Sequence, residues 1–219
     1  MSQWAHKAAI FAALDRLEEH CPGQRGHAER VSVYAVATAE RLAFSLDDLA
    51  TVRDAALLHD LGKLAIESEL LNGRGTLDRE GLLMMKVHCD AFAWIADSLG
   101  LPSEILALGP IVVAHHERWD GTGYPMQLAG EAIPPAARVI SVAEVFDAMV
   151  TGSWKPPMPE EETLAAIREL SGHAFEPAAV EAFFRVQPLI QPVAEPLAGP
   201  PRSMPRAARR WRASRPDSR

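Results

Sequence analysis

The sequence predicts an all-α fold, on three observations. Apolar residues recur every three or four positions along most of the chain, as the buried face of a helix requires. No alternating run of apolar and polar residues is long enough to predict a strand. Clusters of glycine and proline lie between the helical segments, where turns are expected. With 219 residues, 48% of them apolar, the chain can form one domain with a substantial core.

Three helices are predicted before residue 60. The first covers residues 4–19 and ends before the turn Cys21-Pro22-Gly23. Its apolar stripe consists of Ile10, Phe11, Leu14 and Leu17. The second covers residues 27–43, and its stripe consists of Val31, Tyr34, Thr38 and Leu42. Ser45, three residues before Asp48, predicts a capped start for a third helix that continues to about Leu58.

Two further helical segments follow a glycine-containing stretch at residues 72–75. The first covers residues 78–99, and its stripe consists of Leu82, Met85, Cys89, Phe92 and Leu99. The second covers residues 103–117, and its stripe consists of Ile105, Leu108 and Val112. We expect Pro110 to kink or restart this helix, because proline lacks a backbone N–H.

The sequence of the last part of the chain predicts a loop, three helices and a tail. The sequence Asp120-Gly121-Thr122-Gly123-Tyr124-Pro125 predicts the loop, because two glycines and a proline interrupt any regular element. Pro134-Pro135 predicts the start of a helix. The helices are expected at residues 135–151, 160–171 and 176–187. We therefore expect an N-terminal helix over residues 1–23, one domain over 24–189, and a disordered or extended tail over 190–219.

The net charge of −7 combines two parts of opposite sign. Residues 190–219 hold seven arginines and two acids, a net charge of +5, so the first 189 residues carry −12. A basic arm can bind anionic lipid or nucleic acid through nonspecific charge. We expect an unstructured tail without nucleic-acid binding instead. Its removal after about residue 189 should then leave the melting temperature and any hydrolysis nearly unchanged.

The composition excludes a collagen, a disulfide scaffold and a chain that is disordered throughout. Two cysteines, Cys21 and Cys89, are too few for a secreted fold held by disulfide bridges. No apolar run approaches the roughly 20 residues of a membrane span. The N-terminus lacks the features of a signal peptide, so a cytoplasmic protein is expected.

Histidines at the ends of apolar runs predict a metal site. His59-Asp60 ends the run AALLHD, and His115-His116 ends the run IVVAHH. An unpaired charge is costly in apolar surroundings, and a metal ion removes that cost for several groups at once. Imidazole and carboxylate ligands suit Zn, Fe, Mn or Ni. Taken alone, each pair has a plainer interpretation: an HD pair arises by chance, and His115-His116 could be one core and one exposed histidine.

The order of these residues along the chain strengthens the metal interpretation. The series is His27, His59-Asp60, His88, His115-His116 and Glu144, with 31, 27, 26 and 27 residues between successive members. Each member lies on or at the end of a predicted helix, which is how a helical bundle builds a metal site. Three other histidines, His6, His20 and His173, are expected to have structural roles only.

The segments around these residues follow one another over residues 24–187. They are AALLHDLGKLAI, MKVHCDAF, VVAHHERWDGTGYPMQLAGEAIPPAARVISVAEVFDAM and HAFEPAAVEAF. In this order they resemble the HD-GYP branch of the HD metal-dependent phosphohydrolases. The resemblance implies a helical bundle that binds two divalent ions, usually Fe or Mn, with Asp60 bridging them. The implied ligands are His27, His59, Asp60, His88, His115, His116 and Glu144.

The resemblance also implies a reaction, the hydrolysis of the second messenger cyclic di-GMP to pGpG or GMP. Asp60 and Lys63 would be the catalytic residues, with Lys63 contacting the scissile phosphate or assisting the leaving oxygen. The GYP loop would contribute to the substrate pocket and contact a GGDEF-type diguanylate cyclase domain. The residues expected to bind substrate are Lys63, Asp120, Gly123, Tyr124 and Lys155. Asp120 has a second interpretation, as a residue that pins the turn.

The sequence departs from the family pattern after HDLGK, where residues 65–67 and 71–75 lack the proline and lysine that the family commonly has, and at three further places. Glu144 stands where the family usually has aspartate. Gly23 stands where members with three metals have glutamate, so two metals are expected here. Lys155 is the only cation in the segment 151–157, where the family usually has an arginine-containing stretch that contacts the substrate phosphates.

Three functions are therefore compatible with the sequence. The first is an active phosphodiesterase of cyclic di-GMP. The second is a module that keeps its metal but binds a nucleotide or a cyclase partner without hydrolysis. The third is a hydrolase of another phosphorylated substrate, such as a different cyclic dinucleotide.

Overall fold

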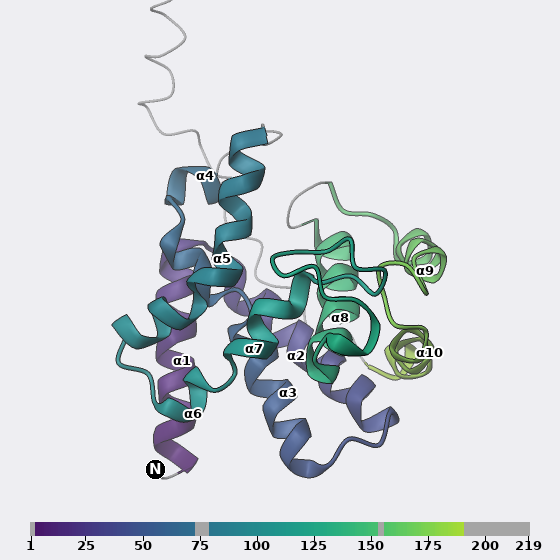
Figure 1. Cartoon of the computed structure of the whole chain (residues 1–219), viewed down its shortest axis with the longest axis horizontal. Helices are drawn as coiled ribbons and strands as arrows, with labels where there is room; N and C mark the ends of the chain where they lie inside the picture. The colour runs from purple at the N-terminus through teal and green to yellow at the C-terminus, as the bar shows by residue number, and fades with distance from the viewer. Residues whose placement is uncertain (1–2, 73–78, 153–155, 191–219) are drawn as a thin grey trace, which may run out of the picture.

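The computed structural model describes residues 3–72, 79–152 and 156–190, which form helices and turns without a strand (Figure 1). The predicted all-α fold is confirmed. Lys155 and all of the predicted tail except its first residue lie outside the described residues.

The first three helices are α1 (Gln3–His20), α2 (Gln24–Arg41) and α3 (Leu46–Leu58). Helix α2 begins three residues earlier than predicted. The Glu18 carboxylate accepts hydrogen bonds from the backbone N–H groups of Gly23 and Arg25 at 2.8 and 3.0 Å, and so caps this start. The predicted cap of α3 is confirmed, because Ser45 Oγ accepts a hydrogen bond from the Asp48 N–H at 3.2 Å.

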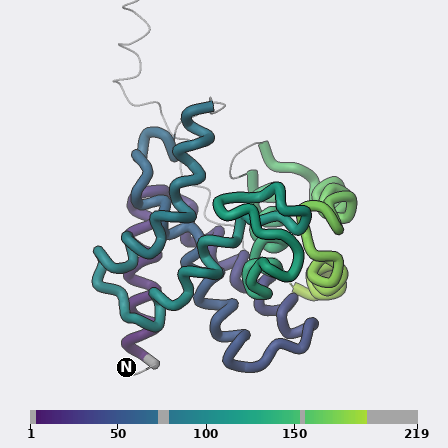
Figure 2. The backbone as a smooth tube through the Cα atoms, in the orientation of Figure 1, coloured from purple at the N-terminus to yellow at the C-terminus, as the bar shows by residue number. Residues whose placement is uncertain are grey.

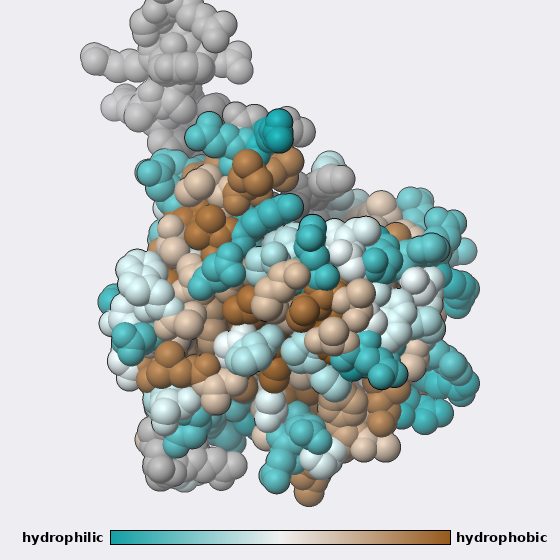
Figure 3. All heavy atoms as spheres, viewed as in Figure 1, coloured by the Kyte–Doolittle hydropathy of each residue, from teal (hydrophilic) through white to brown (hydrophobic). Residues whose placement is uncertain are grey.

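Two short elements follow that were not predicted, the 3-10 turn η1 (Leu61–Ala65) and helix α4 (Ser68–Asn72). Helix α5 (Arg79–Ser98) is close to its predicted range. Two residues of the predicted stripes are exposed, Phe11 by 44% and Leu82 by 55%, and Leu42 and Leu99 are only partly buried. Phe11 lies beside the buried face of α1, where the Arg25 guanidinium packs over its ring at 5.5 Å. Leu82 lies in the first turns of α5, where hydrophobic side chains gather on the surface (Figure 3).

The single helix predicted over residues 103–117 is divided into α6 (Ser103–Leu106), α7 (Gly109–Val113) and the 3-10 turn η2 (Ala114–His116). The expected restart at Pro110 is confirmed, because α7 begins with this proline in its first turn. The tightening into η2 was not predicted, and it carries His115 and His116.

The three remaining helices match their predicted order. They are α8 (Pro135–Thr151), α9 (Glu160–Glu169) and α10 (Pro177–Val186). Two 3-10 turns, η3 (Gly130–Ala132) and η4 (Gln187–Leu189), were not predicted. Among the described residues, no helix is both long and apolar enough to cross a membrane.

Helices α2 and α8 lie at the centre of the bundle. Helix α2 packs against α3, α8 and α10, while η1 packs against α5. Helices α9 and α10 cover the far side of α8 from α5 (Figures 1 and 2). The rings of Tyr34, Phe146 and Phe183, from α2, α8 and α10, meet at centroid distances of 5.1–5.8 Å. This packing fixes α2 and α8 beside the end of α3, the middle of α5 and the turn η2, where buried polar residues are found.

Candidate metal centre

The predicted ligands come from separate elements and converge around Asp60. They are His27 from α2, His59 and Asp60 at the end of α3, His88 from α5, His115 and His116 from η2, and Glu144 from α8. The Asp60 carboxylate lies 3.4, 3.6 and 3.9 Å from the Nε2 atoms of His59, His88 and His27, respectively. Asp60 is therefore the shared centre of the cluster, and it is only 2% exposed.

A second part of the cluster surrounds His88. Its Nε2 atom lies 3.3 Å from His115 Nε2, and the His116 Nε2 atom lies 3.7 Å from Glu144 Oε1. His115 is fully buried, whereas 24% of the His116 side chain is exposed. One histidine of the pair is thus in the core and the other reaches the surface, yet both have a ligand nitrogen facing the cluster.

Backbone carbonyls orient three of the imidazoles. The Nδ1 atoms of His59, His88 and His115 hydrogen-bond the carbonyls of Ala56, Met85 and Val112, in each case three residues earlier. A hydrogen bond at Nδ1 leaves Nε2 as the free ligand atom. The local helical geometry therefore turns each Nε2 atom toward the cluster, those of His59 and His88 toward Asp60 and that of His115 toward His88.

Asp147 orients His27, and the sequence did not single it out. Its Oδ2 atom lies 2.7 Å from His27 Nδ1, and both of its oxygens accept hydrogen bonds from the Arg30 guanidinium at 2.6 and 2.9 Å. Asp147 follows Glu144 by three residues on α8, so the two carboxylates share one helix face. That spacing was the available signal in the sequence.

Lys63 and Gly62 connect η1 to the cluster. Lys63 is 3% exposed, and its Nζ atom lies 2.5 Å from Asp60 Oδ2 and 3.2 Å from Gln24 Oε1. It is therefore not a solvated lysine at a helix end. A Cβ atom on Gly62 would lie 1.9 Å from the backbone oxygen of His88, so only glycine allows this approach of η1 to α5.

Unpartnered buried atoms show that these residues fit a metal. Among the described residues, His59 Nε2, Asp60 Oδ1 and Glu144 Oε2 are buried and lack a hydrogen-bond partner. Leaving such groups unpaired is costly, and a cation accepts lone pairs from all three atoms. The donors suit divalent transition ions, because they combine imidazole nitrogens with carboxylate oxygens.

The electrostatics of the cluster favour ligand forms. Burial raises the pKa of Asp60, but Lys63 and the neighbouring histidines outweigh it and hold this pKa well below its usual range. Burial, together with the neighbouring histidines, holds the pKa values of His115 and His116 well below the usual range. An ionised aspartate and neutral imidazoles are the forms that bind metal. Burial raises the pKa of Glu144 to about 7, and Asp60 outweighs burial to raise the pKa of His59, so these two ligands are protonated more readily than Asp60, His115 and His116.

The predicted substrate loop lies against His116. The Tyr124 and His116 rings are 4.8 Å apart and inclined by 31°, and Lys86 Nζ lies 4.6 Å above the Tyr124 ring. Lys86 was not predicted as a site residue. A Cβ atom on Gly123 would lie 2.4 Å from the backbone nitrogen of Arg118, so this glycine allows the loop to fold tightly on itself. The loop thus reaches the cluster at its partly exposed histidine.

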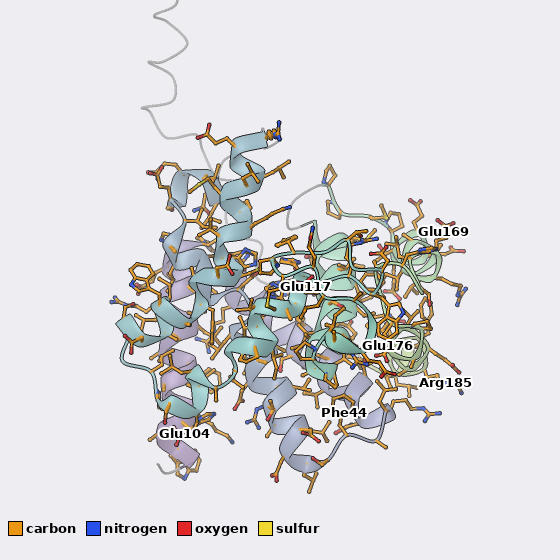
Figure 4. All side chains as sticks on the ribbon, in the orientation of Figure 1. Phe44, Glu104, Glu117, Glu169, Glu176 and Arg185 are labelled. Carbon is orange, nitrogen blue, oxygen red and sulfur yellow. The ribbon has the colours of Figure 1, made fainter. Side chains whose placement is uncertain are left out.

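Two carboxylates hold the loop in shape. Buried Glu117, labelled in Figure 4, accepts hydrogen bonds from the N–H groups of Met126 and Leu128 at 2.6 and 3.1 Å. Asp120 Oδ1 accepts hydrogen bonds from the Thr122 N–H and hydroxyl at 3.0 and 2.6 Å, which lowers the pKa of Asp120. These contacts agree with the interpretation of Asp120 as the residue that pins the turn.

Two of the remaining histidines make structural contacts. His6 Nε2 lies 2.7 Å from Asp54 Oδ2, and His20 Nε2 lies 2.7 Å from the Ile66 carbonyl. His173 is exposed. None of the three is among the grouped metal ligands of the described residues.

Comparison with known proteins decides the family. Residues 13–179 match the HD domain family. The chain belongs to this family. The resemblance to HD-GYP phosphodiesterases is confirmed by a cyclic di-GMP phosphodiesterase of Vibrio cholerae, 38% identical over 81% of this chain and 39% of that protein. A 3'3'-cGAMP-specific phosphodiesterase 3 of the same organism is 35% identical over 85% of this chain and 40% of its own length.

A solved structure supports the fold of this HD domain protein. Bd1817, an HDG"Y"P protein from Bdellovibrio bacteriovorus, matches with a TM-score of 0.61 and 20% identity, over 75% of this chain and 52% of that chain. The chain spans about two-fifths of the length of the two Vibrio cholerae relatives.

Proposed function

We propose that this HD domain is a metal-dependent phosphodiesterase of cyclic dinucleotides and that cyclic di-GMP is its substrate. The observation that carries the proposal is the convergence of histidine and carboxylate ligands on buried Asp60, with three of their atoms unpartnered. The relative with 38% identity bears the name of this activity. A phosphodiester is anionic, and the acidic body of the chain needs bound cations to receive it.

The proposed centre holds two divalent ions in two sets of ligands. One set is His27, His59 and Asp60, and the other is His88, His115 and His116, with Asp60 between them and Glu144 beside His116. When bound, two such ions activate water as the nucleophile and stabilise negative charge on the phosphate.

Lys63 and Asp60 have distinct proposed roles. Asp60 is ionised and bridges the two ligand sets, so it orients both. Lys63 places a positive charge beside Asp60 in a buried site. A charge there interacts more strongly with its neighbours than a charge at the water-exposed surface. When substrate is bound, we propose that the Lys63 Nζ atom contacts the scissile phosphate or assists the leaving oxygen. Gln24 Oε1 holds Nζ at 3.2 Å and limits its movement.

The substrate is proposed to enter beside His116, the partly exposed ligand. Tyr124 presents its ring there, and Lys86 supplies a cation over that ring. Gly123 and Asp120 shape the loop that places Tyr124. An aromatic ring and a lysine at one opening suit the base and the phosphate of a nucleotide, respectively. Lys155 stays a predicted phosphate contact outside the described residues.

A second substrate, 3'3'-cGAMP, is favoured by one observation. The chain is almost as similar to the 3'3'-cGAMP-specific relative as to the cyclic di-GMP phosphodiesterase, at 35% and 38% identity. The two substrates differ in one base, so the metal centre itself cannot distinguish them.

The test compares both substrates on one preparation. Protein purified anaerobically under reducing conditions and loaded with Fe or Mn is incubated with cyclic di-GMP or 3'3'-cGAMP, and the products are separated by chromatography. We expect linear pGpG or GMP from cyclic di-GMP. The double variant His59→Ala, Asp60→Ala should lose both metal and turnover, whereas His173→Ala, at an exposed histidine, should retain both.

Other outcomes would redirect the proposal. Faster turnover of 3'3'-cGAMP would reassign the substrate. Full metal occupancy without turnover of either nucleotide would contradict the enzyme and favour a binding module. In that case the GYP loop, with Met126 exposed beside Tyr124, is the proposed contact to a GGDEF-type cyclase domain.

A further inference from the structure

Cys89 lies inside the cluster, although the resemblance does not assign it a role. It follows His88 on α5, and its side chain is fully buried. Its Sγ atom lies 3.5 Å from His88 Nε2, the nitrogen that faces the cluster. The Asp60 carboxylate is 3.6 Å from the same nitrogen. The thiol is therefore as close to His88 Nε2 as the Asp60 carboxylate is.

The sulfur also approaches the other histidines of this set. One ligand atom from each of Cys89, His88, His115 and His116 can be chosen so that all four lie within 4.8 Å of one another. The cysteine thus belongs to a group with three histidines, whereas an isolated core thiol would have apolar neighbours only.

The separations between these atoms are those of neighbouring ligands on one ion. With metal–nitrogen bonds of about 2.0–2.1 Å and a metal–sulfur bond of about 2.3 Å, two nitrogens lie about 3.3–3.4 Å apart, and a nitrogen and a sulfur about 3.5 Å apart. The nitrogens of His88 and His115 are 3.3 Å apart, and the Cys89 sulfur is 3.5 Å from His88. These separations allow the three atoms to bind one ion.

We propose that Cys89 Sγ is a ligand of the second metal ion, together with His88, His115 and His116. This inference rests on the metal binding proposed above. On binding, the sulfur coordinates as thiolate and its proton leaves to solvent. Three imidazoles and a thiolate favour Fe²⁺, Co²⁺ or Zn²⁺ over Mn²⁺ and Mg²⁺, because thiolate is a soft ligand. Cys89 therefore makes this half of the centre selective among the ions that an HD domain can meet.

Cobalt binding tests the assignment by spectroscopy. The full chain is stripped of metal with a chelator under reducing conditions and titrated with Co²⁺. We expect visible d–d absorption from the bound ion and a near-ultraviolet band from thiolate-to-cobalt charge transfer. Cys89→Ser should keep the d–d absorption and lose the charge-transfer band. Cys21→Ser is the matched control, because Cys21 is the other buried cysteine and is outside the ligand group.

Competition between ions tests the selectivity. In the unaltered chain and in Cys21→Ser, Zn²⁺ should displace Mn²⁺ from the second set of ligands. In Cys89→Ser, the preference for Zn²⁺ over Mn²⁺ should fall by about tenfold or more, because a hard hydroxyl replaces the thiolate. An unchanged preference would overturn the selectivity.

A measurement on the unaltered chain tests the assignment without requiring that a variant folds. X-ray absorption of the zinc-loaded protein should show a sulfur neighbour at about 2.3 Å beside nitrogen neighbours at about 2.0–2.1 Å. A spectrum with nitrogen and oxygen neighbours only would overturn the role of Cys89 and leave the metal centre standing. Absence of any cobalt or zinc binding would overturn the metal centre itself, and the cysteine assignment with it.

Discussion

Asp147 and Arg30 hold His27 from the side away from the cluster. The Asp147 carboxylate accepts hydrogen bonds from Arg30 and meets His27 Nδ1, so His27 Nε2 is left facing Asp60. These hydrogen bonds keep the carboxylate ionised, because they lower the pKa of Asp147 against the opposing influence of burial. An ionised partner at Nδ1 makes the imidazole a stronger ligand.

Asp147→Asn should therefore weaken metal binding by about 10–100-fold while the fold persists, since the amide keeps the shape and loses the charge. The metal dissociation constant is measured by competition with a chromophoric chelator. Asp54→Asn is the matched control, because Asp54 also lies 2.7 Å from a histidine, His6, and pairs with an arginine. Equal affinities of the two variants would show that Asp147 does not position His27.

Glu144 should make the stability of the metal-free protein depend on pH. Its pKa is about 7 in the folded chain, whereas an unfolded glutamate titrates near pH 4.3. Between these values the folded protein keeps a proton that the unfolded chain has released, so the free energy of unfolding falls as pH rises. The contribution is fully present below about pH 4.5 and is lost above about pH 7.

Glu144→Gln removes this titration. Across the same window, the unfolding free energy of the unaltered protein should fall by up to about 3 kcal/mol relative to that of the variant. Urea unfolding in the presence of a chelator, at pH 5, 6, 7 and 8, measures the difference. A difference that is constant with pH would place the Glu144 pKa near its ordinary value.

At the scale of elements, the contact of η1 with α5 positions both Asp60 and His88. The absence of a Cβ atom on Gly62 lets the backbone at residue 62 approach the His88 carbonyl. Gly62→Ala should separate the two elements and destabilise the fold by about 1–3 kcal/mol or more, because the clash involves the backbone and not a flexible side chain.

The matched control is Gly109→Ala in α7. A Cβ atom there has Phe92 at 4.0 Å as its nearest neighbour, which is ordinary contact, and alanine suits a helix. Thermal unfolding and metal content should both change in Gly62→Ala and stay close to those of the unaltered protein in Gly109→Ala. Normal metal binding by a stable Gly62→Ala variant would contradict the role of this contact.

Across the whole molecule, local pattern predicted more than long-range pairing did. Apolar spacing predicted α1, α2 and α5 to within a few residues, because those helices bury one face in a common core. Pro134-Pro135 predicted the start of α8. The turn η2 was missed, since nothing in IVVAHH distinguishes a 3-10 turn from a continued helix. The partnership of His27 with Asp147 was missed because it joins residues 120 positions apart and depends on how α2 packs against α8.

Because the ligands come from α2, α3, α5, η2 and α8, metal binding should stabilise the whole bundle. An ion that binds only the folded chain, present at one hundred times its dissociation constant, adds about 2.7 kcal/mol to the free energy of unfolding. For a chain of this size that raises the melting temperature by about 5–10 °C. Thermal unfolding in a chelator and with added Fe²⁺ or Zn²⁺ measures the shift. The double variant His59→Ala, Asp60→Ala should show no shift, since it lacks the shared carboxylate. A similar shift in that variant would mean that the ion stabilises the protein from elsewhere than the cluster around Asp60.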